Sequence, residues 1–231
     1  MKKIFALIFC SLLVVLAIAP SALSFSVGKQ NNLIIASIGD SQTAERSSLG
    51  GAYMVQTYPY VAAQSRAVAN VINAGISGNT TTQMNARFAT DVLASGAGAM
   101  SEMGFVNDLT TNISGGTWVG GGISAATTKA NIKAMATAAI AAKAHFTILS
   151  AVPVFQTVYL NNASAYLTAV SQICSEVGTA NCTYVDVYSA FIAACPGAPP
   201  CSLLLDEQHP NAAGHAFIAS LASAPAFKQY P

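Results

Sequence analysis

The chain contains few charged residues. They make up 8% of its 231 residues, and ten basic against nine acidic side chains give a formal net charge of +1, whereas about a quarter of an average soluble protein is charged. Apart from Lys2-Lys3 there is no cluster of lysine or arginine. Binding of nucleic acid through a basic patch is therefore excluded. Disorder is disfavoured as well, because a hydrophobic content of 53% suffices for a large core.

Long hydrophobic runs are also scarce. Only residues 4–19 form a long and nearly apolar stretch, and it falls short of the ~20 residues that a helix needs to cross a bilayer. Elsewhere the apolar residues are diluted by Ala, Gly, Ser, Thr and Asn. This distribution excludes a polytopic membrane protein.

The N-terminus has the pattern of an export signal. Lys2 and Lys3 precede the apolar stretch, Pro20 ends it, and small residues follow at Ala22 and Ser24. The pattern predicts a signal peptide over 1–24, a single domain over 25–231, and a secreted or periplasmic protein without a stable membrane span. The alternative is a signal anchor that stays attached.

Removal of residues 1–24 would leave an even number of cysteines: Cys174, Cys182, Cys195 and Cys201. An even count in an exported chain favours disulfides. Four cysteines allow three pairings, and proximity in the sequence favours 174 with 182 and 195 with 201. Zinc is the competing interpretation, but the spacing lacks paired C-x-x-C motifs, and the chain has no H-E-x-x-H motif. We therefore predict no metal site and no cofactor.

Apolar runs of strand type alternate with segments of helical spacing. Strands are predicted over 33–38, 67–73, 97–103, 146–152 and 183–187, and helices over 80–93, 124–144, 163–177 and 212–222. Such alternation predicts a three-layer α/β/α sandwich around a central parallel sheet of about five strands. Functional groups of these sheets lie beyond the carboxyl ends of the strands. The loops 39–43, 74–80, 103–108 and 153–160 should therefore share one edge.

Two of the polar segments can together form a nucleophile and its base. Ser41 directly follows the first predicted strand in Gly39-Asp40-Ser41, and the chain has no G-x-S-x-G nucleophile elbow. Asp206 stands three residues before His209, a spacing that can bring carboxylate and imidazole together. The other two histidines are predicted to be structural or packing residues.

Two further segments supply donors for a developing negative charge. Gly78 stands just before a predicted helix, where a backbone N–H can face an anion. Asn107 follows the third predicted strand, where its side-chain amide can donate a hydrogen bond to an oxyanion. Each segment alone could equally be an ordinary turn.

In the order Ser, Gly, Asn and Asp-x-x-His, the four segments resemble the blocks of the SGNH hydrolase family, also called GDSL esterases/lipases. The matching sequences are GDSQT, NAGISGNT, VND and DEQHPN. The resemblance implies the SGNH, flavodoxin-like fold, a triad of Ser41, Asp206 and His209, and an oxyanion hole from Ser41, Gly78 and Asn107. One departure concerns the third block, usually Gly-x-Asn-Asp. Phe105 holds the glycine position here, and Gly104 stands one residue earlier, which puts the backbone path of this loop in question.

The resemblance implies hydrolysis of a small-molecule or polysaccharide ester. Trp118 in the glycine-rich segment 114–122, Asp40 and Tyr53 are candidates for substrate contact. Export and a polar, uncharged surface favour an esterase of acetylated carbohydrate. A lysophospholipase, a short-chain lipid esterase or a thioesterase is the alternative, and an inactive carbohydrate-binding or adhesive protein on the same scaffold is a third. The oligomeric state is left open.

Overall fold

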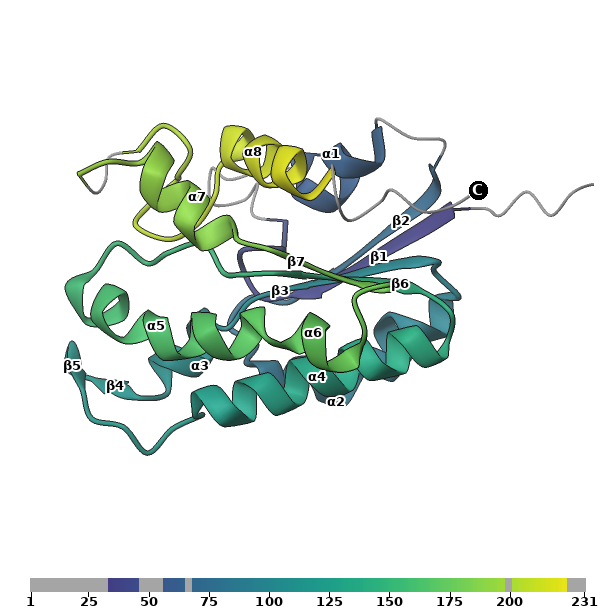
Figure 1. The fold of residues 1–231 in the computed structure, drawn as a ribbon. Helices are drawn as coiled ribbons and strands as arrows, with labels where there is room; N and C mark the ends of the chain where they lie inside the picture. Colours follow the sequence, from purple (N-terminus) through teal and green to yellow (C-terminus); the bar gives the residue numbers. More distant parts are fainter. Residues whose placement is uncertain (1–32, 46–55, 65–67, 198–200, 224–231) are drawn as a thin grey trace, which may run out of the picture. The chain divides into compact units, whose positions relative to one another are not determined.

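Five parallel strands form one sheet in the computed structural model, which describes residues 33–45, 56–64, 68–197 and 201–223. The strands are β1 (Leu33–Gly39), β2 (Val68–Gly75), β3 (Ala99–Met103), β6 (His145–Leu149) and β7 (Cys182–Val185). Their order is β2-β1-β3-β6-β7, and every neighbouring pair is parallel (Figure 1). This is the flavodoxin-like order of a doubly wound sheet. The predicted fold class is confirmed.

Helices cover both faces of this sheet (Figure 1). One face carries α1 (Tyr58–Gln64), α7 (Val187–Ala194) and α8 (Ala212–Ser223). The other carries α2 (Thr81–Asp91), α4 (Ala125–Ala141), α5 (Thr157–Ser171) and α6 (Ile173–Val177). Each layer encloses its own cluster of buried apolar side chains against the sheet. The molecule thus has the three predicted layers.

The middle strand β3 is buried along its whole length, although it contains the polar residues Ser101 and Glu102. Met100 belongs to the core beneath α2 and α4, and Met103 belongs to the opposite core. The Ser101 hydroxyl is paired with Ser37 Oγ at 2.6 Å and with the Tyr58 hydroxyl at 3.3 Å. These hydrogen bonds allow a polar residue at the centre of the sheet.

Several short elements were not predicted. They are the 3₁₀ helix η3 (Leu93–Ser95), α3 (Val106–Thr110), and the hairpin of β4 (Ile113–Ser114) and β5 (Thr117–Trp118). α1 and α7 were missed as well. A segment of two to eight residues contains too little periodicity to be distinguished from a loop. The helix predicted over 163–177 begins earlier, at Thr157, and is divided at Gln172 into α5 and α6.

The two disulfides pair the cysteines as proximity in the sequence predicted. Cys174 in α6 is bonded to Cys182 in β7, and Cys195 at the end of α7 is bonded to Cys201. Across the described residues, no helix is long and apolar enough to cross a membrane. The predicted signal peptide and Tyr53 lie outside the described residues.

Candidate active site

A tight turn at the carboxyl end of β1 presents Ser41. The backbone N–H groups of Thr43 and Ala44 donate to the Asp40 carbonyl oxygen at 3.2 and 3.0 Å, and the Gln42 N–H donates to Asp40 Oδ1 at 2.8 Å. Gly39 makes the turn possible, because a Cβ there would collide with the Thr43 side chain and the Met103 carbonyl oxygen. The local sequence thus fixes the direction in which the chain leaves the sheet.

Ser41, His209 and Asp206 form a continuous chain of hydrogen bonds. Ser41 Oγ lies 3.0 Å from His209 Nε2, although the two residues are 168 positions apart. On the other side of the ring, His209 Nδ1 lies 2.7 Å from Asp206 Oδ2. A carboxylate in this place holds the imidazole in the tautomer whose Nε2 can accept a proton from the serine.

Backbone groups of its own loop hold the Asp206 carboxylate in place beside the His209 ring. Its Oδ1 accepts the backbone N–H groups of Gln208 at 2.9 Å and His209 at 2.8 Å. Partial burial opposes ionisation, but the hydrogen bonds from the His209 ring and from these two N–H groups outweigh it and lower the pKa of Asp206. The carboxylate is therefore charged at neutral pH. The His209 ring is mostly shielded from solvent, whereas the Asp206 side chain is 46% exposed.

Gly78 lies on the exposed loop between β2 and α2 with a φ of +82°. A side chain would meet no atom within 4 Å there, so glycine is favoured by the backbone angle and not by lack of space. Arg87 ties this loop to the serine turn, because its Nε donates to Asn79 Oδ1 at 2.8 Å and its Nη2 to the Gly39 carbonyl oxygen at 3.0 Å. Arg87 thus connects the residue after Gly78 to the end of β1, two residues before Ser41.

Asn107 lies in the short helix α3 and is partly buried. Its Nδ2 donates to the Asn79 carbonyl oxygen at 3.0 Å and to Asp40 Oδ2 at 3.3 Å. The third block is therefore brought against both the serine turn and the Gly78 loop. Asp40 itself is fully buried, which makes it an internal partner of Asn107 and keeps it from the surface that a substrate could reach.

The glycine of the third block is needed one position earlier than in the usual pattern. Gly104 has a φ of +146°, and a Cβ there would lie 2.8 Å from Asp40 Oδ2. Phe105 adopts an ordinary negative φ and directly precedes α3. The departure at Phe105 thus leaves Asn107 in contact with the other blocks.

Two buried acids near the site were not explained by the sequence. Asp108 accepts the Thr81 N–H at 2.8 Å and the hydroxyls of Thr81 and Thr128, each at 2.5 Å, and so joins α2, α3 and α4 behind Asn107. Burial raises the pKa of Asp108, and these hydrogen bonds oppose the shift. Only the tertiary structure reveals this role, because its two partner residues lie in separate helices, α2 and α4.

Glu102 on β3 is the second of these acids. It is fully buried, and neither of its carboxyl oxygens has a hydrogen-bond partner among the described residues. Burial and, to a lesser extent, the negative charges of Asp40 and Asp108 raise the pKa of Glu102 well above its ordinary value. Burial therefore favours the protonated, uncharged form of the Glu102 carboxyl group.

Trp118 lies on the hairpin that follows α3 and packs partly buried against the core. Asn112 anchors the hairpin, since its carbonyl oxygen accepts the N–H groups of Val119 and Gly120 at 2.8 and 3.1 Å. The ring thus combines a packing role with partial exposure.

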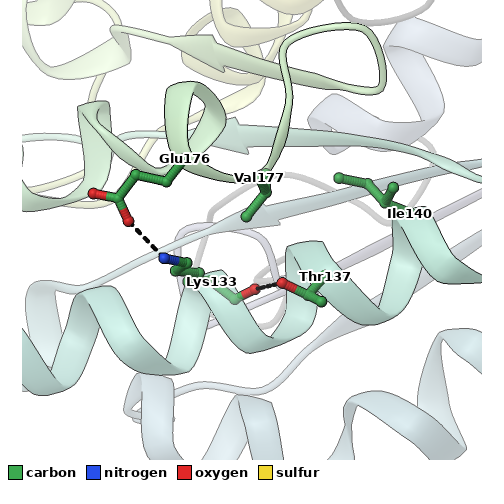
Figure 2. Close-up of a pocket in the computed structure, with 5 residues that line it drawn as sticks. All are labelled: Lys133, Thr137, Ile140, Glu176 and Val177. Atoms are coloured by element: carbon green, nitrogen blue, oxygen red, sulfur yellow. Dashed lines mark hydrogen bonds and ion pairs between the residues drawn. The ribbon is translucent and has the colours of Figure 1, made fainter.

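A separate hollow of about 230 Å³ lies between α4 and α6 (Figure 2). It is lined by Lys133, Thr137, Ile140, Glu176 and Val177, with Lys133 Nζ 2.8 Å from Glu176 Oε2. Since α6 leads into the amino end of β7, this hollow belongs to the edge of the sheet opposite to Ser41.

In the described ranges, no three His, Cys, Asp or Glu side chains are grouped so that they could hold a metal ion.

The match to a protein family covers most of the chain. The model of the GDSL-like lipase/acylhydrolase family matches residues 37–217, a span that contains all four blocks. The chain belongs to this family. It is accordingly a serine hydrolase that acts on ester bonds.

Solved structures of other proteins share the fold of this family member at low sequence identity. An acetylxylan esterase from Geobacillus stearothermophilus is 21% identical, with 85% of this chain and 94% of that chain covered and a TM-score of 0.68. A putative lipolytic protein of the G-D-S-L family from Desulfitobacterium hafniense is 20% identical, with 83% and 98% covered and a TM-score of 0.64. No curated protein is significantly similar in sequence.

Proposed function

We propose that this GDSL-family protein is an exported esterase in which Ser41 is the nucleophile, His209 the general base and Asp206 the residue that orients the imidazole. The hydrogen-bonded chain from Ser41 Oγ through the His209 ring to Asp206 Oδ2, with distances of 3.0 and 2.7 Å, carries this proposal. Nucleophile and base within hydrogen-bond reach, with the base held by a third group, are what serine hydrolysis requires.

In the first step, Ser41 Oγ attacks the ester carbonyl carbon while its proton passes to His209 Nε2. The carbonyl oxygen becomes an oxyanion, held by the backbone N–H groups of Ser41 and Gly78 and by Asn107 Nδ2. Asn107 donates to Asp40 at 3.3 Å and to Asn79 at 3.0 Å. We infer that the longer of these bonds is the one exchanged for the oxyanion.

In the second step, the protonated His209 gives its proton to the departing alcohol, and an acyl group stays on Ser41 Oγ. Water then gives a proton to His209 Nε2 as it attacks the acyl carbon, and the proton returns to Ser41 when the acid leaves. The ionised Asp206 stabilises the imidazolium that forms in both half-reactions.

An acetyl ester of a carbohydrate is the substrate class that we propose. The similar fold of an acetylxylan esterase and the scarcity of charged side chains support it. A lipid ester is the alternative, because the family includes lipases. The two disulfides support export, since disulfides persist mainly in oxidising compartments, and residues 1–24 would be the signal peptide.

Labelling of the serine tests this proposal. A fluorescent organophosphonate should label the wild-type protein and the control Ser171→Ala, whose serine lies exposed on α5. Ser41→Ala should fold, escape labelling and lose ester hydrolysis. Equal labelling of Ser41→Ala would refute the assignment, and an unlabelled wild-type protein would favour an inactive binding protein.

The substrate class is tested with the wild-type enzyme. We expect acetate release from acetylated xylan and a rate on p-nitrophenyl esters that falls from acetate to octanoate. Faster hydrolysis of long acyl chains or of lysophospholipid would instead assign a lipid ester.

A further inference from the structure

Ser41 and His209 come from loops that no strand pairing joins. Ser41 follows β1, which pairs only with β2 and β3 in the five-stranded sheet. His209 lies in the segment before α8, which adds no strand to that sheet. Contacts between the loops therefore help to set the 3.0 Å separation of Ser41 Oγ and His209 Nε2.

The side chain of Gln42 makes such contacts from the position next to Ser41. It is fully buried. Its Oε1 accepts the Val152 N–H at 2.8 Å, and its Nε2 donates to the carbonyl oxygens of Val152 at 2.9 Å and of Gln208 at 3.1 Å. Gln208 immediately precedes His209. One amide thus connects the serine turn to the loop after β6 and to the histidine loop.

The loop after β6 and the histidine loop are also joined directly. The Phe155 N–H donates to the Glu207 carbonyl oxygen at 2.9 Å. Together with the bonds of Gln42, this contact closes a triangle of three loops around the Ser41–His209 pair. A triangle of fixed contacts resists sliding of one loop past another, which a single contact would permit.

The contacts of position 42 require an amide of this length. The side chain must accept from one backbone N–H and donate to two carbonyl oxygens, which an amide can do and an ionised carboxylate cannot. An apolar side chain would leave the buried Val152 N–H without this acceptor. The motif that names the family, G-D-S-L, has leucine at this position. Leucine cannot form these hydrogen bonds, so the connection between the three loops is a property of chains that carry glutamine here.

We propose that Gln42 is a positioning residue for ester hydrolysis, which holds the serine turn and the histidine loop at the separation that lets His209 Nε2 accept the Ser41 proton. The inference rests on the proposed function of Ser41 and His209. Gln42 acts through these residues and does not contact the reacting atoms. A displacement of about 1 Å between catalytic groups can cost about 10²-fold in rate, so loss of its contacts should lower the rate of proton transfer.

The test replaces the amide by an apolar side chain of similar length, in Gln42→Met. We expect the kcat for p-nitrophenyl acetate and the rate of Ser41 labelling by an organophosphonate to fall together by about 10- to 10²-fold. The KM should change little, because the contacts that bind the ester are untouched. Gln42→Leu provides the same comparison with the side chain of the family motif, in case the methionine variant does not fold.

Two controls separate positioning from a general loss of stability. Gln172→Met removes an amide that accepts from Lys129 Nζ at the junction of α5 and α6, and it should retain the wild-type kcat. Ile132→Val removes a methylene from the buried face of α4 and should lower the Tm without lowering the kcat at an assay temperature where all variants are folded.

A kcat and labelling rate near wild type in a folded Gln42→Met or Gln42→Leu variant would overturn the inference. An equal loss in Ile132→Val would do the same, since the effect would then follow stability. An unlabelled wild-type protein would instead refute the proposed function, and the inference with it.

Discussion

At the scale of single residues, Glu102 is the least expected feature of the molecule. Among the described residues its fully buried carboxyl group has no hydrogen-bond partner, and burial favours the protonated form, which keeps a charge out of the core. In the unfolded chain the same group releases its proton near its ordinary pKa of 4.5. Folding and proton binding at Glu102 are therefore coupled.

This coupling predicts how stability depends on pH. Because burial raises the pKa of Glu102 in the folded state, its contribution is fully present below about pH 4.5 and is lost as the pH rises toward the folded value. We therefore compare the unfolding free energies of Glu102→Gln and the wild type. The variant's value minus the wild-type value should increase by up to about 1.4 kcal/mol per pH unit in this window. Urea unfolding at pH 4, 6 and 8 measures the difference.

Glu176→Gln is the matched control for this experiment. Hydrogen bonds from Lys129 and Lys133 lower the pKa of Glu176, so its replacement should produce no gain that grows with pH. Parallel pH profiles of Glu102→Gln and the wild type would contradict the prediction.

At the scale of elements, α1 and α8 are joined by a buried histidine. The Tyr58 N–H in the first turn of α1 donates to His215 Nδ1 in α8 at 3.2 Å, and the two rings stack with centroids 6.5 Å apart. The contact requires a neutral ring whose Nδ1 is unprotonated. Burial keeps the ring neutral, because burial lowers the pKa of His215 from 6.5 to about 4.

Acid should therefore weaken the packing of α1 on α8. The unfolded chain takes up a proton at His215 near pH 6.5, whereas the folded protein resists until about pH 4. The stability that this histidine contributes is present above pH 6.5 and is lost as the pH falls through this window. We expect His215→Asn, whose amide oxygen can replace Nδ1 as acceptor, to show a flatter pH dependence of unfolding free energy between pH 7 and 4. Equal slopes in wild type and variant would refute this role.

At the scale of the whole molecule, the disulfides close short loops of the chain. They join residues 8 and 6 positions apart and so restrict the unfolded chain less than long-range bridges would. We expect the double variants Cys174→Ala/Cys182→Ala and Cys195→Ala/Cys201→Ala each to lose about 2–3 kcal/mol of unfolding free energy. Both should still fold, because the sheet and its two cores are formed by other contacts.

Urea unfolding of the oxidised wild type and of each double variant measures this loss, and the retained kcat of p-nitrophenyl acetate hydrolysis checks that the fold survives. A variant that fails to fold would show that its disulfide organises the core.

The sequence alone determined the fold class and the order of the four blocks, and it favoured the cysteine pairs that the structure contains. These are local signals: strand and helix periods, polar residues directly after strands, and cysteines too close in the chain to favour other partners. The displacement of Gly104 was also evident from the sequence, but its close approach to Asp40 became known only from the structure.

Only the tertiary structure decided how the site is held together. The side chain of Gln42 bonds to residues 110 and 166 positions away, and Asp108 bonds to residues 20 and 27 positions away. The burial of Glu102 could not be predicted from the sequence of its own strand. The sequence gives the chemistry that a side chain can perform. The partners that it meets, and therefore its charge state and its position, depend on which distant segments the fold brings beside it.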